Sequence, residues 1–226
     1  MKKMTRQLSL FGLSLIVGLA STMALAEPEL YETGPGEETA YVRFVNATDQ
    51  AVSISSSKGA AKIALGAKAA ERASRFYKVS AGAKLTAMVQ SGKQKTSVEV
   101  TGKPWEYITI AVLPNGAGQV KTRLVRETPT DFNAMRASLA LFNLDPSCAN
   151  AMMQGGAKKA TILSEVAPLT VQRRLVNPIK LAVAVSCGKS PDVSVDLAQL
   201  QAGERYSVFL FSLKNIPQAV FAVDAN

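Results

Sequence analysis

The stretch Ala40-Tyr41-Val42-Arg43-Phe44-Val45-Asn46 has a second copy 97 residues later, Ala137-Ser138-Leu139-Ala140-Leu141-Phe142-Asn143. In the first copy Val42 and Phe44 lie on one face, and Tyr41 and Arg43 lie on the other. This period of two is typical of a half-buried β-strand. Each copy therefore predicts a strand that opens a module and ends at an asparagine.

Further segments repeat in the same order, with an offset of 96 to 99 residues. The matched pairs are 84–89 with 180–185, 97–100 with 194–197, and 107–112 with 206–211. Each half contains six or seven predicted short strands in about 95 residues, separated by turn signals. The pattern predicts an all-β fold of two tandem immunoglobulin-like β-sandwich domains, related by internal duplication.

The N-terminus has the pattern of a cleaved signal peptide over residues 1–26. A basic n-region precedes an apolar run over 8–20, and Ala24-Leu25-Ala26 is a small-residue cleavage motif. The apolar run is shorter than the roughly 20 residues that a membrane-spanning helix needs, which argues against an uncleaved anchor. We expect an N-terminal domain over 27–130 and a C-terminal domain over 131–226.

Two stretches interrupt the strand pattern. Residues 58–73 are rich in Ala, Gly and Lys, and their composition leaves a loop and a weak helix open. Residues 149–160 resemble an inserted loop rich in Met and Gly. Within it, Met152 and Met153 suit an adaptable contact surface, and a packed loop accounts for them equally well.

A corner precedes the most apolar strand of each half. In both halves a Gly-containing turn leads to a tyrosine, Tyr107 in the first and Tyr206 in the second. This arrangement predicts a tyrosine corner, in which the ring is buried and the hydroxyl bonds to nearby backbone.

Composition excludes several kinds of chemistry. The chain has no His, which excludes a Ser-His-Asp triad, a His general base and a His metal site. Its two cysteines, Cys148 and Cys187, predict one disulfide in an exported protein. Gly188-Lys189-Ser190 is not a phosphate loop, because Val183 stands where that motif needs its first glycine. We predict no catalytic, cofactor-binding or metal-binding residue.

The formal net charge of +9 includes three basic residues of the signal peptide. No run of Lys and Arg is longer than two, so a nucleic-acid interface is not indicated. Aromatic, basic and Met side chains are the remaining candidates for contact with a partner or a glycan. They are Tyr41, Arg43, Tyr77, Trp105, Met152 and Met153.

Several short motifs are spread over nearly the whole mature chain. They are Leu30-Tyr31 with Gly34-Pro35, Ala40-Tyr41-Val42-Arg43 with Asn46, Trp105-Glu106-Tyr107, Leu141-Phe142-Asn143-Leu144, and Cys148 with Cys187. In these the chain resembles the AlgF family. The resemblance implies a periplasmic accessory protein, needed to add acetyl groups to mannuronate residues of alginate. It also implies that the protein acts together with a membrane-bound O-acetyltransferase and periplasmic acetyl-handling proteins (AlgI, AlgJ and AlgX).

We therefore expect a non-catalytic periplasmic adaptor that links components of the acetylation machinery. The alternative is a module that binds the polyuronate alginate itself, which the positive charge motivates. A third class, an acetyl carrier or esterase that uses Ser or Lys, has the least support, because no spacing marks such a residue.

Overall fold

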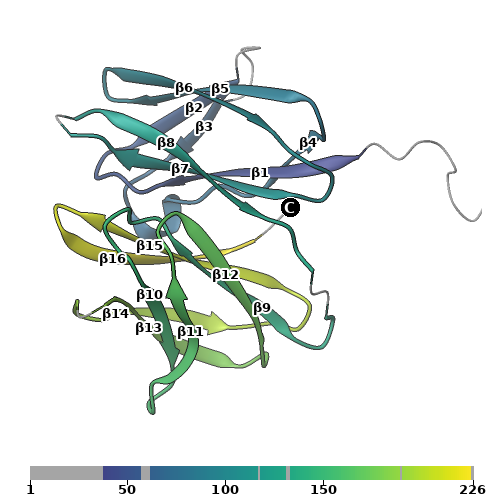
Figure 1. Ribbon diagram of the computed structural model, residues 1–226, viewed down its shortest axis with the longest axis vertical. Coiled ribbons are helices and arrows are strands. Elements are labelled where there is room, and N and C mark those ends of the chain that lie inside the picture. The colour runs from purple at the N-terminus through teal and green to yellow at the C-terminus, as the bar shows by residue number, and fades with distance from the viewer. Residues whose placement is uncertain (1–37, 57–61, 117, 131–132, 189, 225–226) are drawn as a thin grey trace, which may run out of the picture. The chain divides into compact units, whose positions relative to one another are not determined.

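Sixteen β-strands run through the residues that the computed structural model describes, which are 38–56, 62–116, 118–130, 133–188 and 190–224 (Figure 1). The predicted signal peptide lies outside these residues. The strands of the first half are β1 (Thr39–Asn46), β2 (Val52–Ser56), β3 (Lys62–Leu65), β4 (Tyr77–Ser80), β5 (Lys84–Ser91), β6 (Gln94–Thr101), β7 (Tyr107–Pro114) and β8 (Val120–Glu127). The strands of the second half are β9 (Ala137–Asn143), β10 (Ala151–Gly155), β11 (Ala160–Val166), β12 (Thr170–Val176), β13 (Lys180–Cys187), β14 (Val193–Gln199), β15 (Arg205–Leu213) and β16 (Ile216–Val223).

The two halves have the same topology. The first forms sheets of order β4-β1-β7-β8 and β3-β2-β5-β6, and the second forms β12-β9-β15-β16 and β11-β10-β13-β14. In each half the opening strand pairs in parallel with the seventh, and the other pairings are antiparallel. The prediction of two duplicated β-sandwiches is confirmed, with eight described strands in each.

The stretch at 58–73 contains a strand that the sequence did not reveal. Residues 62–65 form the edge strand β3, and a single 3₁₀ turn, η1 (Ala69–Glu71), follows. Four residues are too few to display a clear period of two, which is why composition left this stretch undecided.

Each sandwich has its own apolar core. Val42 and Phe44 of β1 face Ile54 and Val89 of the opposite sheet, as the alternation predicts. In the second sandwich Leu139 and Leu141 of β9 occupy the matching positions. These side chains are at most 4% exposed, so one face of each opening strand is fully desolvated.

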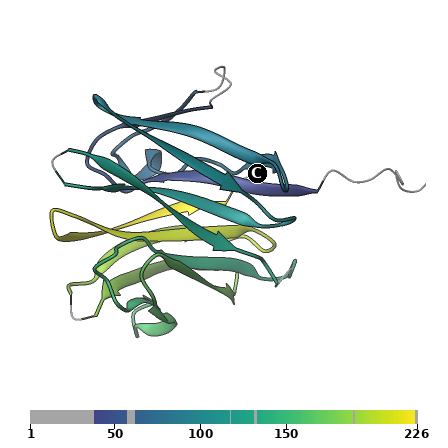
Figure 2. The same cartoon turned by 45° about the horizontal axis from the view of Figure 1, so that its top comes forward.

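The other face of β1 is buried as well, so the prediction of a half-buried strand is wrong. A third apolar cluster joins the sheet β4-β1-β7-β8 to the sheet β12-β9-β15-β16 (Figure 2). Val45 and Ala111 contribute from the first sheet, and Phe142 and Phe209 from the second. We call this packed layer the seam. It removes the outer faces of β1 and β9 from water.

The asparagine that ends each opening strand makes matching hydrogen bonds in both halves. Asn46 is fully buried, and its Nδ2 donates to the carbonyls of Gln50 (2.7 Å) and Gly66 (2.8 Å). Asn143 is equally buried and donates to the carbonyls of Cys148 (2.7 Å) and Val166 (2.9 Å). In each case Oδ1 accepts the backbone N–H two residues later. The asparagine thus holds together the loops at one end of its sandwich.

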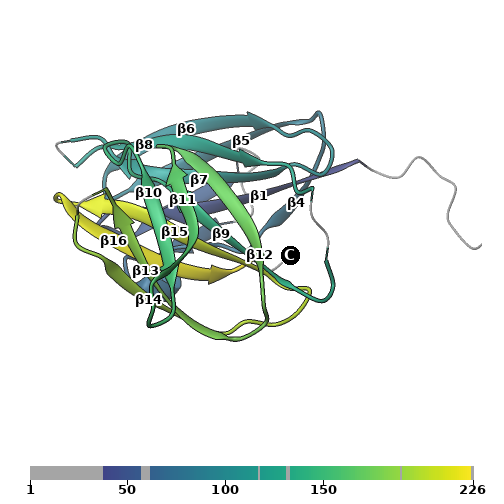
Figure 3. The ribbon, with the colours of Figure 1, turned by 60° about the horizontal axis from the view of Figure 1, so that its bottom comes forward.

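The prediction of an inserted loop over 149–160 is wrong. Ala151–Gly155 forms β10, the counterpart of β2, and pairs with β11 and β13 (Figure 3). Met153 is fully buried in the second core, and Met152 on the opposite face is half-buried. The run of Met and Gly concealed a strand because neither residue is typical of strands.

The predicted disulfide is present between Cys148 and Cys187, whose Cα atoms lie 5.5 Å apart. It joins the loop before β10 to the end of β13. The tyrosine corner is confirmed at Tyr206, where the hydroxyl oxygen accepts the backbone N–H of Gln201 at 2.8 Å. At the matching position of the first half, the ring of Tyr107 stacks on Tyr41 with centroids 4.5 Å apart.

The paired asparagines generate a stability prediction. Asn46→Asp keeps the shape of the side chain but removes both Nδ2 donors, which leaves two carbonyls facing a carboxylate. We expect a loss of about 3 kcal/mol or more in the free energy of unfolding, measured by urea denaturation. Asn143→Asp serves as the matched variant and should cost a similar amount. A loss below about 1 kcal/mol in either variant would contradict this role.

Candidate functional site

Arg43 lies at the centre of the seam and is 1% exposed. Its Nη1 donates to Asp224 Oδ1 at 2.6 Å, and its Nη2 donates to Ser207 Oγ at 2.8 Å. Its Nε donates to Thr109 Oγ1 at 2.9 Å, on the β7 residue that lies beside it in register. Ser207 Oγ in turn donates to Asp224 Oδ1 at 2.7 Å. One side chain of the first half is therefore bonded to two polar groups of the second half.

Three aromatic rings surround the same guanidinium. Arg43 Cζ lies 4.4 Å from the ring centroid of Phe76, 4.7 Å from that of Phe209 and 4.9 Å from that of Phe142. Cation–π attraction is strongest for a desolvated cation. The rings therefore offset part of the cost of burying the charge.

A second arginine extends the network toward the edge of the seam. Arg173 of β12 forms a two-pronged ion pair with Glu127, the last residue of β8. Its Nη2 also donates to Asp224 Oδ2 at 3.0 Å. Arg205 Nη2 lies 3.4 Å from Glu127 Oε2, in ion-pair range, but without the geometry of a hydrogen bond. We call these five groups (Arg43, Arg173, Arg205, Glu127 and Asp224) the seam cluster.

Neighbouring charges set the ionisation of the seam cluster. Burial acts to raise the pKa of Asp224, but Arg43 and Arg173 outweigh it, so that its pKa falls below the ordinary carboxyl value. Burial lowers the pKa of Arg43, and Asp224 opposes this shift. Burial and the charge of Arg173 lower the pKa of Arg205. Guanidinium groups stay protonated in proteins, so three cations face two carboxylates here.

This arrangement is suited to holding the sandwiches together. Ser207 and Asp224 form a hydroxyl–carboxylate pair, yet Ser207 is 0% exposed and its oxygen already accepts from Arg43. A nucleophile needs an open path to its substrate and a base that takes its proton. Ser207 has neither, since a carboxylate held by two guanidiniums is a weak base.

The corner before β7 presents a different kind of feature. Glu106 N–H donates to Lys103 carbonyl at 3.1 Å, which closes a turn with Pro104 second and Trp105 third. Trp105 has φ of 62°, in the left-handed region, and is 65% exposed. Bulky residues rarely adopt this conformation, which costs roughly 1–2 kcal/mol.

The matching corner of the second half has glycine in this place. Gly203 has φ of 79°, and its N–H donates to Arg136 carbonyl at 2.9 Å, just as Trp105 N–H donates to Thr39 carbonyl at 2.8 Å. The same backbone turn is therefore made once with the residue it favours and once with a tryptophan.

The structure separates the six predicted contact residues. Arg43 lies in the seam, Tyr41 is buried on the same face of β1 and stacks on Tyr107, and Met153 lies in the second core. Tyr77 and Met152 are half-buried, and Trp105 is exposed. They do not form one surface. Sequence reasoning also missed Glu127 and Asp224, because one ends and the other follows an ordinary strand, and no spacing connects them to Arg43.

The buried ion pair generates a prediction that a double-mutant cycle can measure. Arg43→Met leaves Asp224 with one guanidinium and removes donors to Thr109 and Ser207. We expect a loss of about 3–5 kcal/mol in the free energy of unfolding. In Arg43→Met/Asp224→Asn the loss should be smaller than the sum of the single losses by about 1–3 kcal/mol. Additive losses in urea denaturation would show that the two side chains do not interact.

The lowered pKa of Asp224 generates a prediction about pH. A carboxyl with a lower pKa in the folded state stabilises the fold above its unfolded pKa of about 3.9, and this stabilisation is lost as pH falls through the folded value. The difference in unfolding free energy between wild type and Asp224→Asn should therefore be constant above about pH 5 and shrink below about pH 4.

Asp192→Asn is the control, because Asp192 pairs with Lys159 at the surface, where an ion pair contributes less than about 1 kcal/mol. Urea denaturation at pH 7, 4 and 3 makes the measurement. A difference between wild type and Asp224→Asn that does not change with pH would contradict the assignment.

Within the described ranges, no helix is long and apolar enough to cross a bilayer, and no group of three His, Cys, Asp or Glu side chains is placed to hold a metal ion.

No curated protein matches the sequence. Among solved structures, the C-terminal domain of AlgF from P. aeruginosa matches with 24% identity and a TM-score of 0.34, over 39% of this chain and 98% of that one. The Bacillus anthracis TIE protein matches with 8% identity and a TM-score of 0.24, over 80% of this chain and 34% of that one.

The sequence model of one family, described as "Alginate O-acetyl transferase AlgF", matches residues 13–207. This range covers both sandwiches from β1 into β15. A disulfide such as Cys148–Cys187 is typical of proteins that fold outside the cytoplasm. The chain therefore belongs to the AlgF family and takes part in the acetylation of alginate.

Proposed function

We propose that this chain is a non-catalytic adaptor of the periplasm. It binds proteins of the alginate acetylation machinery and holds them together. Its partners are the membrane-bound O-acetyltransferase (AlgI) and the periplasmic acetyl-handling proteins (AlgJ and AlgX). The observation that carries this proposal is the exposed Trp105, held in a backbone conformation that favours glycine.

Two properties of Trp105 support a contact with another protein. Tryptophan is enriched among the residues that dominate binding energy at protein interfaces. A strained conformation persists only when the surrounding structure imposes it, and strained residues gather at functional sites. Glu106 supplies that structure, because its Oε2 accepts from Lys103 N–H and from Arg126 Nη1. The turn therefore presents the indole rigidly, which lowers the entropy cost of binding.

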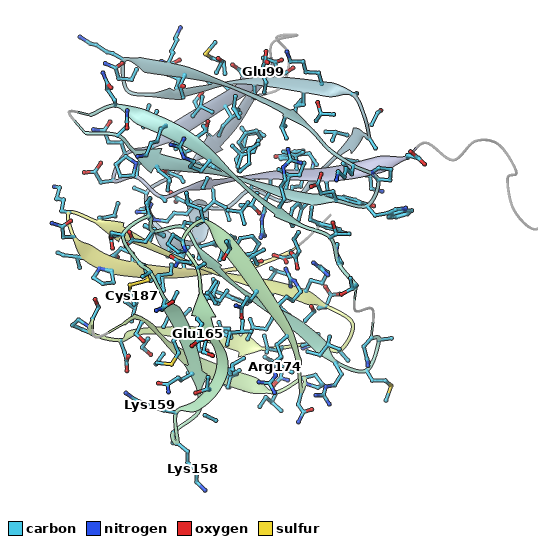
Figure 4. All side chains as sticks on the ribbon, in the orientation of Figure 1. Glu99, Lys158, Lys159, Glu165, Arg174 and Cys187 are labelled. Carbon is cyan, nitrogen blue, oxygen red and sulfur yellow. A yellow bond between two sulfur atoms is a disulfide. The ribbon has the colours of Figure 1, made fainter. Side chains whose placement is uncertain are left out.

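The polyuronate-binding alternative receives less support. It needs arginines on an open face, whereas Arg43, Arg72, Arg173 and Arg205 point into the seam region and are largely buried. Lys158 and Lys159 lie at the tip of the β10–β11 hairpin, where Lys158 points away from the body of the sandwich and Lys159 pairs with Asp192 (Figure 4). The remaining basic side chains are spread over both halves.

Trp105→Gly separates binding from folding. Glycine suits a positive φ, so the variant should keep or gain stability, by roughly 1 kcal/mol in thermal or urea unfolding. Capture of the purified acetylation proteins by the tagged chain should fall at least tenfold, as for the loss of an interface tryptophan. Met135→Ala is the control, since Met135 is an exposed apolar residue that precedes the second sandwich. Unchanged capture by Trp105→Gly would remove Trp105 from the interface.

Two further assays distinguish the functional classes. Titration with oligomannuronate should give no saturable binding if the chain acts only through proteins. Incubation with a chromogenic acetyl ester should release no acetate above the buffer rate. Saturable glycan binding without capture of any acetylation protein would overturn the adaptor proposal in favour of a polyuronate module, and acetate release would overturn its non-catalytic part.

A further inference from the structure

The first sandwich has an open slot between its edge strands β3 and β4. Its volume is about 170 Å³, and its lining comes from both sheets, including Phe44 of β1, Ile63 of β3, Val79 of β4 and Ala87 of β5. Among the described residues of the lining, Ser56 is the one that is neither aliphatic nor aromatic. An apolar cavity of about 150 Å³ holds a benzene molecule, whereas ligand pockets usually measure about 300–1,000 Å³. The slot therefore fits a single apolar side chain.

The same edge of the second sandwich is closed by a hydrogen bond. Arg174 Nη1 on β12 donates to the carbonyl of Ile162 on β11 at 3.1 Å and so joins the two edge strands (Figure 4). Arg174 lies beside Leu139 in register, and Tyr77 lies beside Val42, the counterpart of Leu139. Tyr77 thus stands where the second sandwich has its joining arginine, and it lines the slot instead.

The backbone of β4 is oriented to accept another strand. Tyr41 N–H points toward β7, where it donates to Glu106 carbonyl, so the alternate residue Val42 directs its backbone groups toward β4. Its register partner Tyr77 therefore bonds to β1, and the next residue, Lys78, directs its N–H and carbonyl away from β1. No described strand pairs with this outer edge of β4.

Basic side chains flank the slot. Lys62 precedes the slot residue Ile63 on β3, and Lys78 lies between Tyr77 and Val79 on β4. Arg75 stacks over the ring of Tyr77, with Cζ 5.2 Å from its centroid. An approaching segment therefore meets an apolar hole between positive charges, which favours acidic residues on either side of an apolar one.

We propose that this edge binds an extended, acidic segment of a partner protein, which pairs with the backbone of β4 and inserts one apolar side chain into the slot. The inference rests on the proposed adaptor function and specifies the chemistry of one of its interfaces. Addition of a strand to an exposed sheet edge is an established mode of peptide recognition, in which main-chain bonds give affinity and a side-chain pocket gives specificity.

A synthetic peptide tests the slot without any partner. The probe is Glu-Val-Glu-Phe-Glu-Val-Glu, added to the ¹⁵N-labelled protein and followed by two-dimensional NMR. We expect saturable shifts at residues of β3, β4 and β5. Replacing the central Phe by Ser, or every Glu by Lys, should weaken binding at least about tenfold, because one buried apolar side chain or the flanking charges are lost. No saturable shift at millimolar peptide, or equal binding of the control peptides, would overturn the proposal.

Two variants test whether the slot takes part in partner binding. Ala87→Leu fills the slot from within, and Lys62→Glu/Lys78→Glu reverses the flanking charges at the surface without touching the core. Both should weaken peptide binding and partner capture at least about tenfold. If both variants still capture the partner as well as wild type does, the slot proposal is wrong and the adaptor proposal stands. Failure of wild type to capture any acetylation protein overturns the adaptor proposal, and the peptide titration then decides the slot alone.

Discussion

The ion pair between Arg43 and Asp224 is the interaction on which the arrangement of this chain depends. Both side chains are about 1% exposed, and a buried charge without a partner costs several kcal/mol. Each charge has its partner only if the two sandwiches are in contact, because Arg43 comes from the first described strand and Asp224 follows the last. The ends of the folded region are therefore held to each other, and the sandwiches share a polar network as well as an apolar layer.

Duplication alone does not explain this seam, because the two halves contribute different residues to it. Ala140 stands at the position of Arg43, and Arg173 stands at the position that precedes Tyr77 in the first half, where Phe76 lies. Two copies of Arg43 in matching positions would bring like charges together in a dry layer. The divergence instead places an arginine opposite small and aromatic residues, and a second arginine opposite Glu127. The copies thus kept their cores and changed the faces that meet.

The sequence predicted what depends on local periodicity and missed what depends on contact between distant segments. Alternation in β1 placed Val42 and Phe44 in the core correctly. It also placed Arg43 on the opposite face, but a period of two does not distinguish a face that meets water from one that meets another sheet. The disulfide followed from a count of two cysteines, and Met153 was misplaced because composition suggested a loop. Trp105 was named as a contact, yet its strain became visible only beside Gly203.

The two sandwiches differ in how their edges and corners are closed. The second sandwich has the disulfide, the hydrogen bond from Arg174 that closes its edge, and the glycine that its corner favours. The first has an unclosed edge, and its corner has a tryptophan where the second has that glycine. A strained residue persists only when the surrounding structure holds it in that conformation. The seam couples the two sandwiches through the apolar layer and the ion pair of Arg43 with Asp224, and the first sandwich keeps the open edge and the exposed Trp105 that we propose as its contacts.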